Sequence, residues 1–293
     1  MTIPPWKRFR EFIAPNADRF SILKELVEEA NLEYSIVSIA DNRHFFIAPP
    51  PPEQEFLRSR LTILTAHYDR SPGSPGANDN SAAVFILIET AAKMTKDKIN
   101  NWLIIFTDKE ELENGESIQD QGAYALAAGL KNSGLGNSRV YNFDACGTGD
   151  TIIVSTTAEY LLKKDISPGS EKILASVMEL KENALEAAHH LGMDRVKLAP
   201  TPFSDDAGFL RMGIAAQTIT VLPSNEYMLF VPIVRKNPEF AKILISQRYR
   251  NANNLKLIPE TWRCLNTARD SYLRLTPEHF RSVQRFAEAL CKG

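Results

Sequence analysis

The chain has 293 residues, of which 44% are hydrophobic and 24% charged, a composition typical of a globular protein with one large α/β domain or two small ones. A formal net charge of -2 argues against a nucleic acid or another polyanion as a partner. No stretch reaches the roughly eighteen apolar residues of a membrane span, and the N-terminus has no apolar core of signal-peptide length.

The first predicted elements precede the stretch that carries the chemistry. Apolar residues at helical spacing predict a packing helix over residues 17–30. Two strands are expected over residues 34–39 and 44–47, joined by a turn, with His44 as a structural or surface residue. Residues 49–52 are all proline, which predicts an exposed polyproline-like link because proline cannot join a sheet ladder.

An apolar run over residues 61–66 predicts a buried strand that ends at His67 and Asp69. In an extended chain residues i and i+2 point the same way, so this imidazole and this carboxylate are expected side by side. Such a pair suits a metal ligand and the group that fixes its tautomer. Prolines and glycines then prevent regular structure, and Asp79 comes directly before a helix predicted from Ser81. The stretch is therefore a candidate site for a divalent cation.

The rest of the chain alternates between strands and helices. The expected elements are strands over 102–107, 139–143, 151–155 and 214–222, and helices over 122–130, 170–191 and from Thr276-Pro277 onward. Continuous apolar strands in this order predict an α/β fold with a mixed, mainly parallel sheet and helices on both faces. Sites in such sheets lie at the carboxyl ends of the strands. The polar residues that fall there are His67, Glu110, Glu111 and Asp144.

These motifs resemble those of the zinc-dependent M28 peptidases, a di-zinc aminopeptidase family that also includes glutaminyl cyclases. The resemblance rests on His67-Tyr68-Asp69 and on Gly76-Ala77-Asn78-Asp79-Asn80. It implies a zinc exopeptidase-like three-layer sandwich in a single domain over residues 1–293. It also implies a metal-dependent exopeptidase that hydrolyses the N-terminal peptide bond of small peptides with a metal-activated water.

The resemblance also implies roles for individual residues. His67, Asp79, Glu111 and Asp144 would be the metal ligands, Glu110 the general base, and Asp69 the group that orients His67. The physical reason for the Glu110-Glu111 pair is that adjacent side chains leaving a strand diverge. One can then bind the metal while the other accepts a proton from water.

Two positions depart from the family pattern. Asn266 stands where the family has its last metal-ligand histidine, although Thr267 and Asp270 match. In Ser204-Asp205-Asp206, Asp206 stands at the histidine of the family's Ser-Asp-His element, although a pair of loop carboxylates is an equally good interpretation. Because an amide oxygen is a poor zinc ligand, we expect one tight zinc site and a second site that is weak or holds another divalent cation. The alternative function is that of a non-catalytic or single-metal relative, either a binding or scaffold protein or a glutaminyl cyclase-like acyl transferase.

Two further expectations concern partners and compartment. The resemblance is weakest over residues 224–263, a probable insertion expected to cover the site as a lid or to mediate contact between subunits of a homo-oligomer. The expected partner is a peptide or small amide substrate, with no nucleic acid and no membrane. Three cysteines, Cys146, Cys264 and Cys291, are odd in number and form no CxxC pair, which predicts a reduced cytoplasmic protein.

Overall fold

Strands that were expected from apolar runs form the centre of the molecule. The computed structural model describes residues 4–50, 60–113, 115–165, 167–237, 240–245 and 256–292. Within these residues one eight-stranded sheet has the order β1-β2-β4-β3-β5-β8-β6-β7. The strands are β1 (Tyr34–Ile39), β2 (Asn42–Ile47), β3 (Thr62–His67), β4 (Trp102–Thr107), β5 (Arg139–Phe143), β6 (Thr151–Ser155), β7 (Val196–Ala199) and β8 (Ala216–Leu222).

The middle of this sheet is parallel and its flanks are antiparallel. Strands β4, β3, β5 and β8 run parallel to one another, and β6 runs parallel to β7. The β1–β2, β2–β4 and β6–β8 pairs are antiparallel. The predicted mixed, mainly parallel sheet is therefore confirmed. Because β3, β4 and β5 are parallel neighbours, their carboxyl ends lie at one edge of the sheet.

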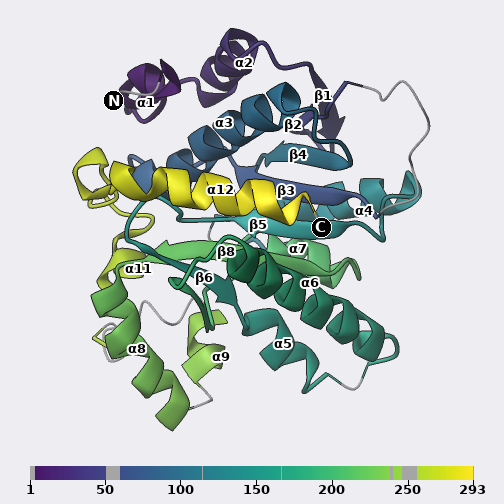
Figure 1. Ribbon diagram of the computed structural model, residues 1–293, viewed down its shortest axis with the longest axis vertical. Helices are drawn as coiled ribbons and strands as arrows, with labels where there is room; N and C mark the ends of the chain where they lie inside the picture. The colour runs from purple at the N-terminus through teal and green to yellow at the C-terminus, as the bar shows by residue number, and fades with distance from the viewer. Residues whose placement is uncertain are drawn as a thin grey trace.

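Helices cover both faces of the sheet (Figure 1). On one face Leu64 and Ile104 pack in the same core as α2 (Arg19–Glu29), α3 (Ala82–Lys96), α6 (Ser170–His190) and α12 (Phe280–Leu290). On the other face Ile63 and Ile105 pack against α4 (Gly122–Asn132) and α7 (Asp206–Arg211). Alternate residues of the same strand thus enter two separate cores, as the strand period of two requires. This arrangement confirms the predicted three layers.

A third core lies at the β6–β8 end of the sheet. Phe230 of α8 (Ser224–Lys236) contacts the rings of Phe240 and Trp262, with centroids 6.0 and 5.3 Å apart. The Phe240 ring belongs to α9 (Phe240–Ile245) and the Trp262 ring to α11 (Glu260–Cys264). All three rings share a core with Ile153 and Leu222 of the sheet. The described parts of residues 224–263 are therefore mostly helical, and their apolar residues pack on the sheet. Their role as a lid or subunit contact stays a prediction, as does the single-domain assignment.

The remaining elements are short. They are η1 (Pro4–Arg8), α1 (Phe9–Phe12), η2 (Ala77–Ser81), η3 (Ile118–Asp120), α5 (Thr157–Leu162), η5 (Tyr272–Arg274) and η6 (Pro277–His279). Among the described residues, no helix is both long and apolar enough to cross a membrane. The proline link is described only in part, because residues 51–59 lie outside the described ranges.

Two details differ from the sequence-based expectations. The short strand β7 was not predicted, because Lys197 interrupts its four residues and leaves no apolar run; the two middle residues, Lys197 and Leu198, are exposed. The last helix was expected to start at Thr276-Pro277, but α12 begins at Phe280 after a separate turn, η6. The Thr276 hydroxyl does not cap that turn, because it donates instead to the carbonyl oxygen of Gly149, 2.9 Å away.

Candidate metal centre

The site begins where β3 ends. His67 is the last residue of β3 and is fully buried, and its Nδ1 lies 3.3 Å from Oδ1 of Asp69. The two side chains are thus side by side, as the extended geometry predicted. The Asp69 carboxylate also accepts hydrogen bonds from the backbone N–H groups of Glu110 and Glu111, at 3.1 and 3.0 Å. One carboxylate therefore connects the end of β3 to the turn that follows β4.

Asp79 lies in a tight turn before α3. The backbone of Gly76 has φ +63°, and a Cβ there would lie 2.8 Å from the carbonyl oxygen of Asp79, so the turn requires glycine. The helix α3 begins at Ala82, one residue after the predicted start, so Asp79 lies just before it as expected; because the backbone of Asp79 is non-helical, the helix itself does not hold it in place. Its position is fixed instead by Asp270, whose carboxylate accepts from the backbone N–H groups of Asn78 and Asp79 at 2.8 and 3.0 Å.

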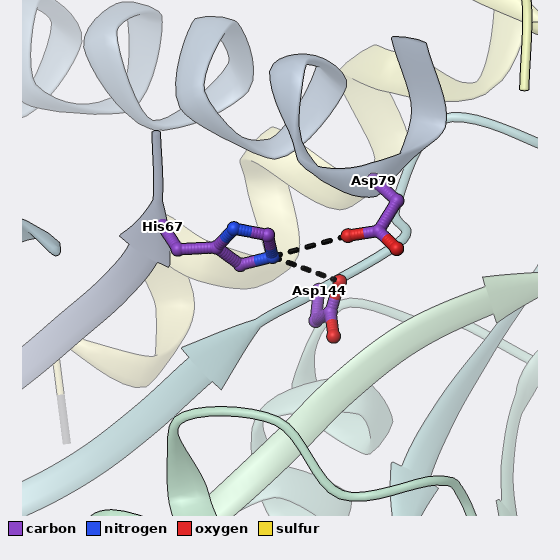
Figure 2. A group of neighbouring side chains, drawn as sticks. All are labelled: His67, Asp79 and Asp144. Carbon is purple, nitrogen blue, oxygen red and sulfur yellow. Dashed lines mark ion pairs between the residues drawn. The ribbon is translucent and has the colours of Figure 1, made fainter. Parts of the chain in front are cut away.

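Asp144 follows β5 and completes the group. Its strand end is tied to the Asp79 turn by Asn80, which donates to the Phe143 carbonyl oxygen at 2.8 Å and accepts from the Ala145 N–H at 3.2 Å. His67 Nε2 lies 3.1 Å from Oδ1 of Asp79 and 3.8 Å from Oδ1 of Asp144 (Figure 2). Candidate ligand atoms of these three side chains all lie within 4.8 Å of one another.

The charges of this group indicate a cation. Burial would lower the pKa of His67, but the carboxylates of Asp144, Asp69 and Asp79 outweigh burial and hold that pKa well above its usual value. Burial and the neighbouring Asp144 carboxylate raise the pKa of Asp79. Both Nε2 of His67 and Oδ1 of Asp144 are buried without a hydrogen-bond partner. Unpartnered buried nitrogen and oxygen atoms that converge in this way fit a divalent metal ion, and imidazole with carboxylate oxygens is a donor set that zinc accepts.

Glu110 and Glu111 lie beside this group, after β4. The Ser71 hydroxyl donates to Oε2 of Glu111 at 2.7 Å, while Oε1 of Glu111 is buried without a partner. Burial and the Asp79 carboxylate raise the pKa of Glu111 to about 8. Burial, together with the carboxylates of Glu111, Asp144 and Asp205, raises the pKa of Glu110 well above its usual value. The Glu111 carboxylate does not belong to the compact His67, Asp79 and Asp144 group, and its role as a metal ligand stays a prediction.

The Ser204-Asp205-Asp206 element is buried rather than a solvated loop. Asp205 accepts a hydrogen bond from the Thr107 hydroxyl at the end of β4, and Asp206 accepts one from the Ser204 N–H at 2.9 Å. Both carboxylates are 0% exposed and each retains one oxygen without a partner. Burial raises the pKa of each to about 7. Asp206, the residue at the family's histidine position, therefore lies in the protein interior.

Asn266 is held in an unusual backbone conformation. Its φ of +59° lies in the left-handed region, which asparagine tolerates better than most residues. Its Oδ1 is buried and has no hydrogen-bond partner. It precedes Asp270 by four residues in the segment that contacts the Asp79 turn. The side chain thus offers an oxygen atom, which a hard cation accepts more readily than zinc does.

Three supporting residues were not recognised as such in the sequence. In the sequence, Asp270 only matches the family motif, Asn78 is part of the glycine-rich turn, and Arg19 belongs to a predicted packing helix. The Asn78 side chain accepts from the Gly147 N–H at 2.6 Å, and Arg19 donates to the Asp69 carbonyl oxygen at 3.0 Å. All three act on backbone groups far away in the sequence, for which no local pattern exists.

Comparisons with known proteins concern the family and the fold of the chain. The family model described as peptidase family M28 matches residues 47–262. The fold is similar to a Zn-dependent exopeptidase from Parabacteroides distasonis, with TM-score 0.63, 13% identity and 98% and 96% of the two chains covered. It is also similar to a glutaminyl cyclase from Porphyromonas gingivalis, with TM-score 0.61, 14% identity and 98% and 94% covered.

A zinc aminopeptidase from Bacillus subtilis is a larger relative in fold. The TM-score is 0.55 at 18% identity, with 85% of this chain covered, and the match spans 49% of the length of the Bacillus chain. No curated protein matches the chain in sequence. The family assignment therefore rests on the family model, which covers well over half of the residues: the chain belongs to peptidase family M28.

Proposed function

We propose that the chain is a zinc-dependent exopeptidase that removes the N-terminal residue of small peptides. The observation that carries this proposal is the convergence of His67 Nε2 with the carboxylates of Asp79 and Asp144 at the carboxyl ends of parallel strands. These three side chains would hold one tightly bound ion. When bound, zinc supplies positive charge that polarises the scissile carbonyl group and makes a water molecule more acidic.

The protein's own residues orient the ligands and move the proton. Asp69, 3.3 Å from Nδ1 of His67, keeps the proton of the imidazole on that nitrogen and leaves Nε2 free to bind. Glu110 acts as the general base, taking a proton from the attacking water and returning it to the leaving amine. The raised pKa of Glu110 supports this role, because a higher pKa makes the carboxylate a stronger proton acceptor.

Glu111, Asp79 and Asn266 would form a second, weaker cation site. Glu111 and Asn266 each have a buried side-chain oxygen without a partner, which supports this assignment. Because the amide is neutral, zinc should bind there weakly, and a harder ion such as Mn²⁺ or Mg²⁺ should compete well. We expect a peptide or small amide as substrate. The cytoplasmic location stays a prediction from the cysteines, which are all free and buried.

A second candidate is a single-metal acyl transferase of the glutaminyl cyclase type. The incomplete second site at Asn266 and the similarity in fold to a glutaminyl cyclase favour it. A non-catalytic binding protein is a third, supported by the same asparagine and by Asp206. The three candidates differ in their products, because only the cyclase converts an N-terminal glutamine without releasing a free amino acid.

The test combines metal removal with product analysis. Protein purified without chelator is assayed on peptides that begin with leucine, alanine or glutamine, before and after dialysis against chelator and after zinc is restored. We expect zinc-dependent release of the first amino acid, and we expect His67→Ala to lose both bound zinc and activity. Cyclised glutamine as the main product would favour the acyl transferase, and no turnover with tightly bound zinc would favour the binding protein.

A further inference from the structure

Arg19 is a buried cation beside the candidate metal centre. It is the one lysine or arginine among the described residues that is buried, with 6% of its surface exposed. It is the first residue of α2, and it precedes residues 47–262 that the family model matches. Burying a charged group costs free energy unless the group has partners, and the Arg19 guanidinium has them in the Asp69 carbonyl oxygen and the Ser81 hydroxyl.

The guanidinium group of Arg19 holds both ends of the segment formed by residues 69–81. At one end it donates to the carbonyl oxygen of Asp69 at 3.0 Å. At the other end it donates to the hydroxyl of Ser81, which in turn donates to the carbonyl oxygen of Gly76. Asp79 lies between Gly76 and Ser81. The planar guanidinium group therefore fixes the distance between Asp69, which orients His67, and the turn that contains Asp79.

The Arg19 guanidinium group is closely packed between Gly76 and Phe12. A Cβ added to Gly76 would lie 3.1 Å from Nη1 of Arg19, so the turn closes directly on the guanidinium group. The Phe12 ring covers the other side, with the Arg19 guanidinium carbon 4.2 Å from its centroid. The side chain thus has little freedom to move, and the residues that it holds are equally restrained.

A second arginine makes the reciprocal connection. Arg70 belongs to the segment formed by residues 69–81, which we call the site segment. It donates to the carbonyl oxygens of Ile13, Ala14 and Pro15, at 3.1, 2.8 and 2.6 Å. Two arginines therefore join the segments: Arg19 of the N-terminal segment binds the site segment, and Arg70 of the site segment binds the N-terminal segment. Burial, with repulsion from Arg70, lowers the pKa of Arg19 to about 9, so the guanidinium remains charged at neutral pH.

We propose that Arg19 is a positioning residue of the metal centre, which sets the spacing of Asp69 and Asp79 and so raises the affinity for zinc. The inference rests on the proposed function, because it takes His67, Asp79 and Asp144 as the ligands. Arg19 acts through backbone and hydroxyl groups and does not itself bind metal. Its positive charge repels a bound cation, so the proposed gain in affinity comes from geometry.

The experiment measures zinc affinity by competition with a chromophoric chelator, and the visible spectrum of the protein loaded with Co²⁺. The variants are Arg19→Met, which removes the guanidinium group and its charge, and Arg19→Lys, which keeps the positive charge but loses the planar guanidinium group. Ser81→Ala removes one of the two contacts. Arg8→Met is the matched control, because Arg8 lies in the same N-terminal segment and forms ion pairs with the side chains of Glu11, Glu25 and Glu29, away from the site.

We expect zinc affinity to fall about 10- to 100-fold in Arg19→Met, the range found when groups that orient metal ligands are removed. Arg19→Lys and Ser81→Ala should fall by smaller factors, with altered Co²⁺ bands, and Arg8→Met should match the unmodified protein. If Arg19→Met does not fold, the other two variants decide.

Unchanged or tighter zinc binding in the folded variants would overturn the role of Arg19 while leaving the proposed function intact. Absence of zinc binding in the unmodified protein would instead overturn the proposed function, and this inference with it.

Discussion

Two sets of residues build the candidate site, and they differ in how they are placed. His67, Glu110 and Asp144 lie at or just after the ends of parallel neighbouring strands, and the sheet alone brings them together. Arg19 and Asp270 reach the same place from 50 and 191 residues away, and they bind backbone groups. The strand-end residues therefore determine which chemistry is available, while the supporting residues determine how well its geometry is held.

This comparison makes opposite predictions for the two sets. Changes at the strand ends should abolish metal binding or catalysis outright without changing the fold. Changes in the supporting residues should weaken metal binding by degrees and leave the chemistry qualitatively the same.

The largest effect is expected for Glu110→Gln. Loss of a general base typically costs on the order of 10²–10⁴ in rate, and zinc content should not change because Glu110 is not a proposed ligand. Turnover and zinc content are measured together on the same preparation. Glu113→Gln is the control, since Glu113 is an exposed glutamate of the same loop. Near-normal turnover in Glu110→Gln would remove Glu110 from the mechanism.

Asp270→Asn should have a smaller effect, on affinity rather than rate. The Asp270 carboxylate accepts two N–H groups, whereas an amide offers one acceptor oxygen and opposes the second N–H with its own NH₂ group. We expect zinc affinity to fall about 10- to 100-fold, measured by chelator competition.

Asp150→Asn is the control for this change, because Asp150 also accepts a backbone N–H group, that of Ser224, but lies outside the site. Equal zinc affinities in the Asp270→Asn variant and the unmodified protein would show that Asp270 does not position Asp79.

The stability of the metal-free protein should depend on pH through Asp205 and Asp206. Burial raises the pKa of each to about 7, from about 4 in the unfolded chain. Between these values the folded state binds more protons than the unfolded state, so the free energy of unfolding falls as pH rises from about 4 to about 7. Denaturant titrations in chelator at several pH values should show this decline, and Asp206→Asn should make it shallower. Stability that rises over this range would contradict the assignment.

The smallest effect is expected for Asn266→His. An imidazole should bind zinc better than an amide oxygen does, so a second zinc ion should be retained more tightly and zinc-supported activity should increase. Isothermal titration with zinc would report the second binding event. If the unmodified protein already retains two zinc ions after dialysis, another residue completes that site and the change should bring no gain.

The sequence predicted the part of the site that follows from strand ends. Apolar runs identified the central strands, and the polar residues directly after them were expected at one edge of the sheet, which is where His67 and Asp144 meet. The fold class could be predicted for the same reason, since continuous apolar strands that alternate with helices favour a parallel sheet with covered faces.

The supporting residues could not be predicted in this way. Arg19 lies among apolar helix positions and Asp270 in a polar loop, and neither environment indicates that the side chain binds a distant backbone group. In the sequence, Asp205 and Asp206 fit a pair of loop carboxylates as well as they fit the family's Ser-Asp-His element. In the structure they lie at the start of α7 and are buried. Strand β7 could not be predicted either, because it has only four residues and Lys197 interrupts their apolar pattern.

Locating the metal is the most direct test of the proposal that His67, Asp79 and Asp144 bind it. Crystals grown with zinc, with diffraction data collected on either side of the zinc absorption edge, give an anomalous difference map. We expect a strong peak about 2.0–2.2 Å from Nε2 of His67 and from carboxylate oxygens of Asp79 and Asp144. A peak bound to other side chains, or none at these three in protein that retains zinc, would contradict it.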